Sequence, residues 1–238
     1  MALLLSSTLA QPFEVVPGMP QLFSQWANTL GVKVPDFGKS PPSFHYVSGS
    51  PIPIYPIVDD FLSQNFPPGS IHLKNFSLWD GSMINSLTKG RVKHTMLHKT
   101  IEITSLLRQF PERKFILVGD SGEADPETFA QIYDEHKKQI KCIFIRLVPI
   151  PPTTLRQTPE FINSVERFSI VFRRLPGIKW YTFRSADELM DMDLSRGCRP
   201  IPARQRWYHR LLLRLRSIWE RLSGQNFTVH RLRFRSRV

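Results

Sequence analysis

Residues 115–127 read FILVGDSGEADPE, and this stretch decides the fold. The residues Phe115 to Val118 are all apolar, which is typical of a short strand buried on both faces of a sheet. The strand meets Gly119 and Asp120, and a second acid, Asp125, follows just before a proline that can open a helix. A buried strand ending in polar residues predicts a parallel sheet with a functional site at its carboxyl edge.

Apolar runs alternate with amphipathic segments along the rest of the chain, as a parallel sheet with crossover helices requires. The expected strands are residues 44–47, 71–73, 115–118, 142–148 and 180–183. The expected helices are residues 19–30, 56–65, 99–110, 126–138 and 161–174. We therefore predict an α/β domain over residues 1–194, built as a parallel sheet with flanking helices.

The net charge of +12 is concentrated at the C-terminal end of the 238-residue chain. Residues 196–238 hold twelve arginines, no lysine and one acid, Glu220, so this segment alone carries +11. The preceding residues are nearly neutral, and 195–205 has the composition of a linker. We predict that 195–238 is a basic appendage to an ordinary domain.

A helix is expected over residues 206–223, stopped by Gly224. Its apolar face and its arginine face predict a helix that lies on an anionic membrane surface. The residues expected at that surface are Trp207, Arg210, Leu211, Arg214, Leu215, Ile218 and Trp219. Two alternatives stay open: the apolar face packs on the domain, or the arginines bind nucleic acid nonspecifically. Nucleic acid is the less favoured partner, because such a binder needs no paired carboxylates.

The two cysteines, Cys142 and Cys198, are poor material for a disulfide framework, which favours a reducing compartment. The first ten residues, MALLLSSTLA, lack the basic start of a signal peptide. No apolar run approaches the length of a transmembrane helix. We therefore expect a cytoplasmic protein with neither a signal peptide nor a membrane span.

Candidate site residues lie in three short strings. Asp120 and Asp125 share one loop at a sheet edge, and two carboxylates there suit Mg2+, although a turn and a helix cap would also explain them. Ser48, with the amides of Gly49 and Ser50, follows another strand and could hold phosphate oxygens, or could form a plain turn.

Lys99 is the third candidate, at the expected start of helix 99–110. A lysine at that position could neutralise a phosphoryl group, although a surface lysine in a first helical turn is the ordinary explanation. The three strings together point to a phosphate site more strongly than any one of them does.

A serine after one strand, then a lysine, then a strand followed by Gly-Asp and a further Asp is the order of motifs two to four in haloacid dehalogenase-like phosphatases. Residues 8–148 resemble more narrowly the catalytic domain of the actin-patch type of phosphatidate phosphatase. The strings that carry this resemblance are PFEVVPGMPQLFSQW, FHYVSGSPIPIYP, NFPPGSIHLKNF, HKTIEITSLLRQFPERKFILVGDSGEADPETFAQI and IKCIFIRLV.

The resemblance implies a Mg2+-dependent hydrolase of lipid metabolism that converts phosphatidate to diacylglycerol and phosphate through a phospho-aspartate. Ser48, Lys99 and Asp120 would be the catalytic residues. Phosphate would be bound by Ser48, Gly49, Ser50 and Lys99, and the metal by Asp120 and Asp125. The implied partners are phosphatidate or another phosphorylated lipid, a membrane surface to which the enzyme is peripheral, and, by resemblance alone, actin-patch proteins.

The sequence departs from this family at its first motif, Asp-x-Asp-x-Thr, which supplies the nucleophile. No Asp-x-Asp precedes Ser48, and only twelve residues precede Phe13. In this superfamily the strand before that motif is the central strand of a Rossmann-like sheet, so we expect that strand to be missing. The expectation is a chain truncated at its N-terminus and inactive as given, or else a noncatalytic anionic-lipid-binding or adaptor protein with a degenerate phosphatase fold.

Overall fold

The computed structural model describes residues 13–30, 32–34, 38–40, 42–75, 91–149, 159–173, 175, 177–195 and 197–202. The chain divides into two compact units, Met1–Arg199 and Pro200–Val238. The amphipathic helix predicted at 206–223 lies outside the described residues, and the division at 194/195 stays a prediction. Within the described residues, no helix is both long enough and apolar enough to cross a bilayer.

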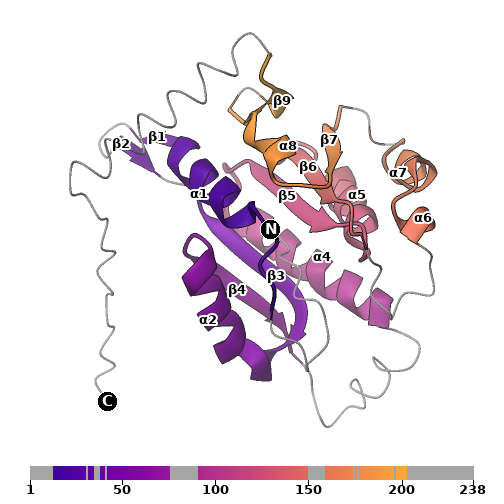
Figure 1. Cartoon of the computed structure of the whole chain (residues 1–238), viewed down its shortest axis with the longest axis horizontal. Coiled ribbons are helices and arrows are strands. Elements are labelled where there is room, and N and C mark those ends of the chain that lie inside the picture. The colour runs from indigo at the N-terminus through magenta and orange to yellow at the C-terminus, as the bar shows by residue number, and fades with distance from the viewer. Residues whose placement is uncertain are drawn as a thin grey trace. The chain divides into compact units, whose positions relative to one another are not determined.

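Helices and strands alternate through the first unit (Figure 1). The strands are β1 (Val32–Val34), β2 (Gly38–Ser40), β3 (Phe44–Pro51), β4 (Gly69–Lys74), β5 (Phe115–Asp120), β6 (Ile140–Arg146), β7 (Trp180–Phe183), β8 (Met192–Asp193) and β9 (Arg199–Pro200). The helices are α1 (Met19–Thr29), the short 3-10 helix η1 (Ile52–Ile54), α2 (Tyr55–Asn65), α4 (Arg91–Gln109), α5 (Asp125–Glu135), α6 (Pro159–Ile162), α7 (Val165–Phe172) and α8 (Asp187–Met190).

The five longer strands form two parallel sheets. Strand β3 pairs with β4, and the second sheet has the order β5-β6-β7. The remaining strands form two small pairs, β1 with β2, which is antiparallel, and β8 with β9. A mixed α/β fold with parallel sheets and flanking helices, as predicted from the alternation of apolar runs, is therefore confirmed.

The two parallel sheets contribute to the same pair of apolar clusters. Tyr46 of β3 and Val118 of β5 belong to one cluster, while their neighbours Val47 and Leu117 belong to the other. Because alternate residues of a strand point to opposite faces, the two clusters lie on opposite faces of both sheets. Between β3 and β5, however, the described residues form no strand pairing.

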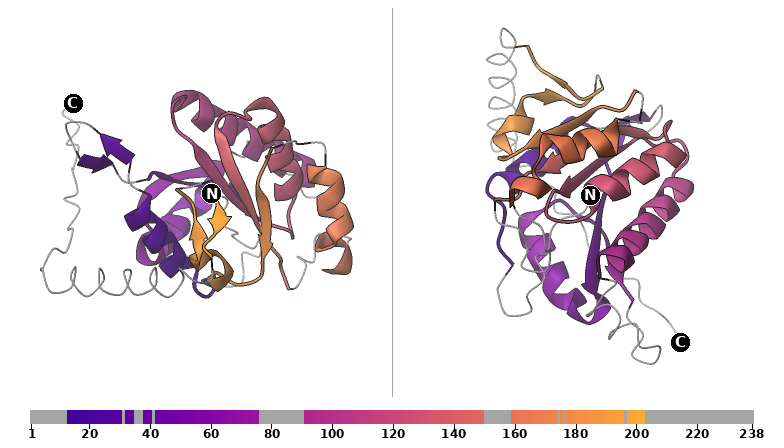
Figure 2. Two further views of the ribbon diagram at one scale, coloured as in Figure 1. Left: turned by 90° about the horizontal axis from the view of Figure 1, so that it is seen from above. Right: turned by 90° about the vertical axis from the view of Figure 1, so that its right-hand side faces the viewer.

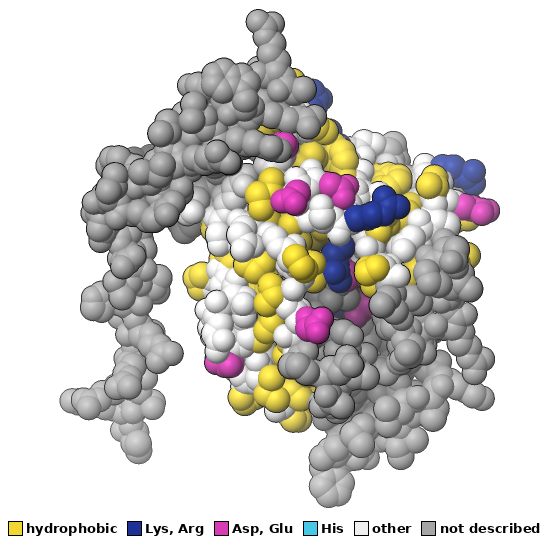
Figure 3. All heavy atoms as spheres, in the orientation of Figure 1, with side chains coloured by type: hydrophobic (Ala, Val, Ile, Leu, Met, Phe, Trp, Pro, Cys, Tyr) yellow, Lys and Arg dark blue, Asp and Glu magenta, His cyan; other side chains and the backbone are white. Residues whose placement is uncertain are grey.

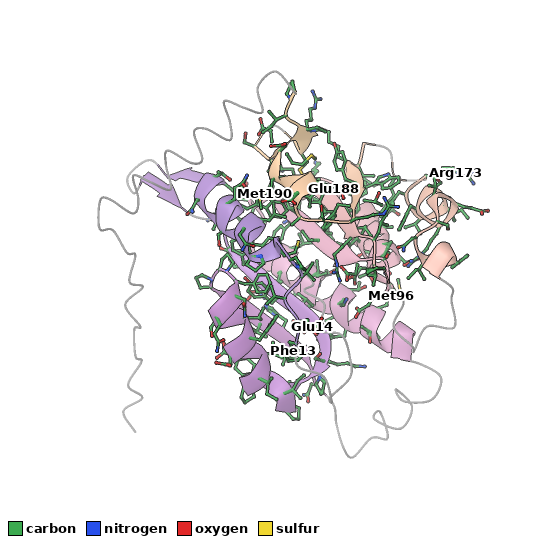
Figure 4. The ribbon with its side chains drawn as sticks, viewed as in Figure 1. Phe13, Glu14, Met96, Arg173, Glu188 and Met190 are labelled. Atoms are coloured by element: carbon green, nitrogen blue, oxygen red, sulfur yellow. A yellow bond between two sulfur atoms is a disulfide. The ribbon has the colours of Figure 1, made fainter. Side chains whose placement is uncertain are left out.

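Helices cover both faces of this layer. Helices α1, α2 and α8 contribute buried side chains to the first cluster, and α4, α5 and α7 contribute to the second. Figure 2 shows α1 and α4 on opposite sides of the strands. In α1, the buried residues Met19, Leu22, Phe23 and Trp26 recur at the spacing of one helical face. Gln25 also donates from Nε2 to the carbonyl of Met190, which Figure 4 labels beside α1.

Two predicted helices differ from the structure in ways that bear on the site, while the others differ by one to three residues at their ends. The helix expected to start at Lys99 starts at Arg91, so Lys99 lies in its middle and not in its first turn. The helix expected over 161–174 is broken into α6 and α7. The break occurs because Ser164 adopts an extended backbone and its side chain accepts from the amide of Arg167, which starts a new helix.

The structure joins the two cysteines in a disulfide, so the expectation that they form none was wrong. Cys142 lies on β6, and both side chains are fully buried. The segment before Cys198 folds back on the sheet because Lys179 Nζ donates to the carbonyl of Gly197 and Tyr181 Oη donates to that of Cys198. Composition alone gave no sign of this long-range contact between residues 56 apart.

Candidate functional site

The carboxyl end of β3 forms the first wall of the site. Ser48 is buried, and its Oγ accepts a hydrogen bond of 3.2 Å from the amide of Ser50 while donating one of 3.1 Å to the Ser50 hydroxyl. The strand continues past the predicted end at Val47 to Pro51. Residues 48–50, which we call the serine loop, are thus not a turn after the strand but the irregular last part of β3, where the pairing with β4 shifts between Val47 and Pro51. The hydrogen bonds between Ser48 and Ser50 tighten this segment.

Helix α4 packs directly on this loop. A Cβ atom on Gly49 would lie 2.7 Å from Cγ2 of Thr95, so glycine is needed for the close approach. His98 forms a hydrogen bond with the backbone of Ser48, and burial lowers the pKa of its imidazole. In the part of the chain that the structure describes, the buried Nε2 of His98 has no hydrogen-bond partner.

Lys99 links α4 to the loop after β5. Its side chain is 4% exposed, and Nζ lies 2.5 Å from Oε2 of Glu123 and 2.5 Å from Oδ1 of Asp125. Burial by itself would lower the pKa of Lys99, but the carboxylates of Asp125 and Glu123 outweigh it and raise that pKa above its ordinary value. The lysine is thus a buried cation held by two acids, and the ordinary explanation as a surface lysine does not apply.

The two aspartates of the loop contact each other through the backbone. The amide of Asp120 donates to Oδ2 of Asp125 at 3.0 Å. A Cβ on Gly119 would lie 2.6 Å from the same oxygen, so no larger residue fits there. Asp125 is the first residue of α5, but its carboxylate is engaged with Lys99 and Asp120 and does not cap the helix.

Asp120 is paired with Arg146, which the sequence reasoning did not single out. Arg146 Nε donates to Oδ1 at 3.0 Å and Nη2 pairs with Oδ2. Burial raises the pKa of Asp120 to about 6, although the hydrogen bonds and charge of Arg146 oppose the shift. The sequence did contain a signal for this pair. Arg146 is a charged residue at the end of an otherwise apolar run, and the carboxyl ends of neighbouring parallel strands lie side by side, so Arg146 could be expected near Asp120.

Residues of α7 and of the turn between α6 and α7 hold the turn between the two aspartates. Arg167 donates to the carbonyls of Ser121 and Glu123 and forms a two-point pair with Glu127. Asn163 accepts from the hydroxyl of Ser121 at 2.6 Å. Sequence reasoning missed both residues, because no local pattern connects them to a turn about 40 positions earlier.

The structure thus brings the predicted site residues to one edge of the sheets. Asp120, Asp125 and Lys99 form a continuous charged cluster, and α4 connects Lys99 to the loop of Ser48 and Gly49 through His98. Figure 4 labels Met96, which belongs to the same turn of α4. Three carboxylates in this cluster, those of Asp120, Glu123 and Asp125, face two cations, Lys99 and Arg146.

Mg2+ fits this donor set only in part. Asp120 and Asp125 are buried carboxylates of the kind a hard cation prefers, and the cluster has an excess of negative charge. Both carboxylates are nevertheless engaged with cationic side chains. Among the residues that the structure describes, no three acidic, histidine or cysteine side chains converge as a metal site. The described residues would therefore supply two metal ligands, and the remaining ligands would come from elsewhere.

Comparison with known proteins shows which family this chain belongs to. The family described as "Phosphatidate phosphatase APP1, catalytic domain" matches residues 1–147, more than half of the chain. The chain belongs to this family. The match includes β3, α4, β5 and β6 and therefore every residue predicted for the site, whereas Asn163 and Arg167 lie beyond it.

Two curated relatives share the family region. The chain is 38% identical over 103 residues to phosphatidate phosphatase APP1 of Saccharomyces cerevisiae, and 28% identical over 104 residues to the uncharacterized protein C29B5.04c of Schizosaccharomyces pombe. Each alignment covers 43% of this chain and 16% of the relative. The chain thus spans about a sixth of the length of these relatives. No solved structure matches it.

Proposed function

We propose that this chain carries the phosphate-binding half of a haloacid dehalogenase-like phosphatase site that acts on phosphatidate, releasing diacylglycerol and phosphate. The observation that carries the proposal is the contact of the buried Lys99 with Asp125, at the sheet edge where Asp120 ends β5. Ser48 lies near the same end of β3, where the pairing with β4 becomes irregular after Val47. Membership of the phosphatidate phosphatase family supports the choice of substrate.

Each residue has a distinct role in this proposal. Ser48, with the amides of Gly49 and Ser50, binds phosphoryl oxygens, and Lys99 stabilises the negative charge that develops on them. Lys99 suits this role because its raised pKa keeps the ammonium charged throughout the neutral range. His98 supports the serine loop through its hydrogen bond to the backbone of Ser48.

Mg2+ would be held by Asp120 and Asp125, together with oxygen ligands from outside the described residues. When bound, it would offset the charge of the phosphoryl group. Arg146 would then have to share or release Asp120, because it engages both oxygens of that carboxylate. Calorimetric titration with Mg2+ tests this part, and we expect Asp125→Asn to abolish any binding seen.

The nucleophile is the element that this sequence does not contain. An Asp-x-Asp-x-Thr strand would fit between β3 and β5, since these strands share both apolar clusters without pairing with each other. We propose that the chain as given does not hydrolyse phosphatidate and that a protein extended upstream by this strand does. A buried strand supplies several backbone hydrogen bonds, so the extension would also stabilise the fold.

The deciding experiment compares phosphate release from phosphatidate by this chain and by the upstream-extended protein. We expect release only from the extended protein, and its loss with Asp120→Asn or Lys99→Met. Lys114→Met, which replaces an exposed lysine bound to the carbonyl of Lys138, is the matched control. If the extended protein folds and binds inorganic phosphate but releases none, the noncatalytic lipid-binding alternative is correct.

The arginine-rich segment would tether the protein to its substrate. We propose that 195–238 binds anionic membranes and that the protein is peripheral to membranes, with actin-patch proteins as partners on resemblance alone. The disulfide between Cys142 and Cys198 removes the cysteine argument for a reducing, cytoplasmic compartment. Flotation of residues 195–238 with phosphatidate vesicles tests the tether. Equal binding to neutral vesicles would remove the electrostatic part of this proposal.

A further inference from the structure

An uncharged apolar segment directly follows the serine loop. Residues 51–58 read PIPIYPIV and come immediately after Ser48, Gly49 and Ser50. Most of this segment faces the solvent: Ile52 is 47% exposed, Tyr55 44% and Ile57 60%. Apolar side chains exposed singly are common on protein surfaces, but a continuous uncharged segment beside a binding site is not.

The fold places this segment at the carboxyl edge of the sheet. Strand β3 runs toward that edge, and α2 returns from it to β4, which is parallel to β3. Tyr55, Pro56 and Ile57, in the first turn of α2, are thus next to the site, and the exposed residues farther along the helix are polar (Asp59, Asp60, Ser63 and Gln64). Figure 3 shows hydrophobic side chains gathered at the lower end of α2, where the helix begins.

The composition of this segment suits a lipid interface. Two isoleucines supply apolar side chains, and Tyr55 has a ring and a hydroxyl of the kind that collects at membrane surfaces. Pro51, Pro53 and Pro56 limit the backbone freedom of the segment, so less entropy is lost when it binds. The next charged residues along the chain, Asp59 and Asp60, are exposed and lie farther along α2.

We propose that Ile52, Tyr55 and Ile57 insert into the surface of a phosphatidate-containing bilayer and so position the lipid phosphate at the loop of Ser48. This inference rests on the proposed function, which assigns the phosphate to that loop. The occupant is the bilayer itself, because the phosphate of a membrane lipid reaches the serine loop only if the adjoining surface enters the interface.

The test places an environment-sensitive fluorophore on the full chain through Ile57→Cys. The native cysteines do not compete for the label, since both are buried and disulfide-bonded. Ile170→Cys is the matched control, because Ile170 is 62% exposed on α7 and has no place in the segment. On addition of phosphatidate vesicles we expect the emission at position 57 to brighten and shift to shorter wavelength, and that at position 170 to stay unchanged.

Three results would overturn the inference. They are vesicle binding without a change at position 57, equal changes at both positions, and the same change at 57 on concentrating the protein without vesicles, which would indicate a second copy as the occupant. Soluble glycerol phosphate should leave the emission unchanged, since it provides the headgroup without the bilayer.

A second measurement separates insertion from catalysis. Ile57→Asp should weaken vesicle binding about tenfold, because the side chain no longer leaves water for the lipid, while Ile170→Asp should not. In the upstream-extended protein, Ile57→Asp should slow phosphate release from vesicles and spare release from a short-chain, water-soluble phosphatidate. If the extended protein without substitutions releases phosphate from neither substrate, the proposed function is contradicted. The fluorescence measurement would still show whether the segment inserts into the bilayer.

Discussion

Arg146 engages both carboxylate oxygens of Asp120, with Nε 3.0 Å from Oδ1 and Nη2 paired with Oδ2. The two residues stand opposite each other at the carboxyl ends of β5 and β6. Asp120, the first acid of the candidate metal site, is therefore neutralised by an arginine on the neighbouring strand. Any cation that binds there competes with Arg146.

Replacing Arg146 by methionine should lower the free energy of unfolding by about 3–5 kcal/mol, because Asp120 is left buried without its partner. The double variant Arg146→Met, Asp120→Asn should recover part of that loss, since it leaves no unpaired charge buried at position 120. Urea denaturation at pH 7 measures both values. If the double variant unfolds no later than Arg146→Met, the arginine does not serve to balance Asp120.

Replacing Arg167 by alanine should loosen the turn between Asp120 and Asp125, because its guanidinium holds the carbonyls of Ser121 and Glu123. We expect faster amide hydrogen exchange in residues 121–124 and a stability loss of about 1–3 kcal/mol. Arg173→Ala is the control, as Arg173 is exposed at the end of the same helix (Figure 4). Unchanged exchange in the turn of Arg167→Ala would contradict a positioning role.

Removing the disulfide should destabilise the fold by about 4 kcal/mol, as expected for opening a loop that joins residues 56 apart. Reduction with dithiothreitol should lower the melting temperature of the native chain and leave that of Cys142→Ala, Cys198→Ala unchanged. If dithiothreitol leaves the melting temperature of the native chain unchanged, the two cysteines are not bonded in solution.

His45 should make stability fall as the pH is lowered. Burial, with His72 adding to it, lowers the pKa of His45 from 6.5 to about 4. The unfolded chain therefore binds the proton more readily between these values, and stability present above pH 6.5 is lost as the pH falls toward 4. The side chain is about half-buried, so the expected loss is only about 1–2 kcal/mol.

The measurement compares urea denaturation at pH 7 and pH 4.5 for the native chain and His45→Gln. The variant should lose less stability than the native chain over this range. His136→Gln, at the end of α5, controls for removing a histidine elsewhere. A native chain and His45→Gln with parallel pH dependence would show that this histidine does not carry the effect.

Local patterns in the sequence were enough to predict the α/β alternation, the parallel strands and the order of Ser48, Lys99, Asp120 and Asp125. These features depend on periodicity and on residue types within a few positions of each other, which the sequence records directly. Helix bounds were less accurate. The sequence predicts a helix that starts at Lys99, whereas α4 starts at Arg91.

Only the tertiary structure decided which charges meet and which apolar side chains stay exposed. Arg146 reaches Asp120 through strand pairing, Arg167 reaches the Ser121 turn from a later helix, and Cys198 reaches Cys142 because its loop folds back on β6. Likewise, Ile57 is as apolar as any core residue, and only its place on the outer side of α2 leaves it in water. Such contacts depend on how distant segments pack, and the identity of a residue does not specify its distant neighbours.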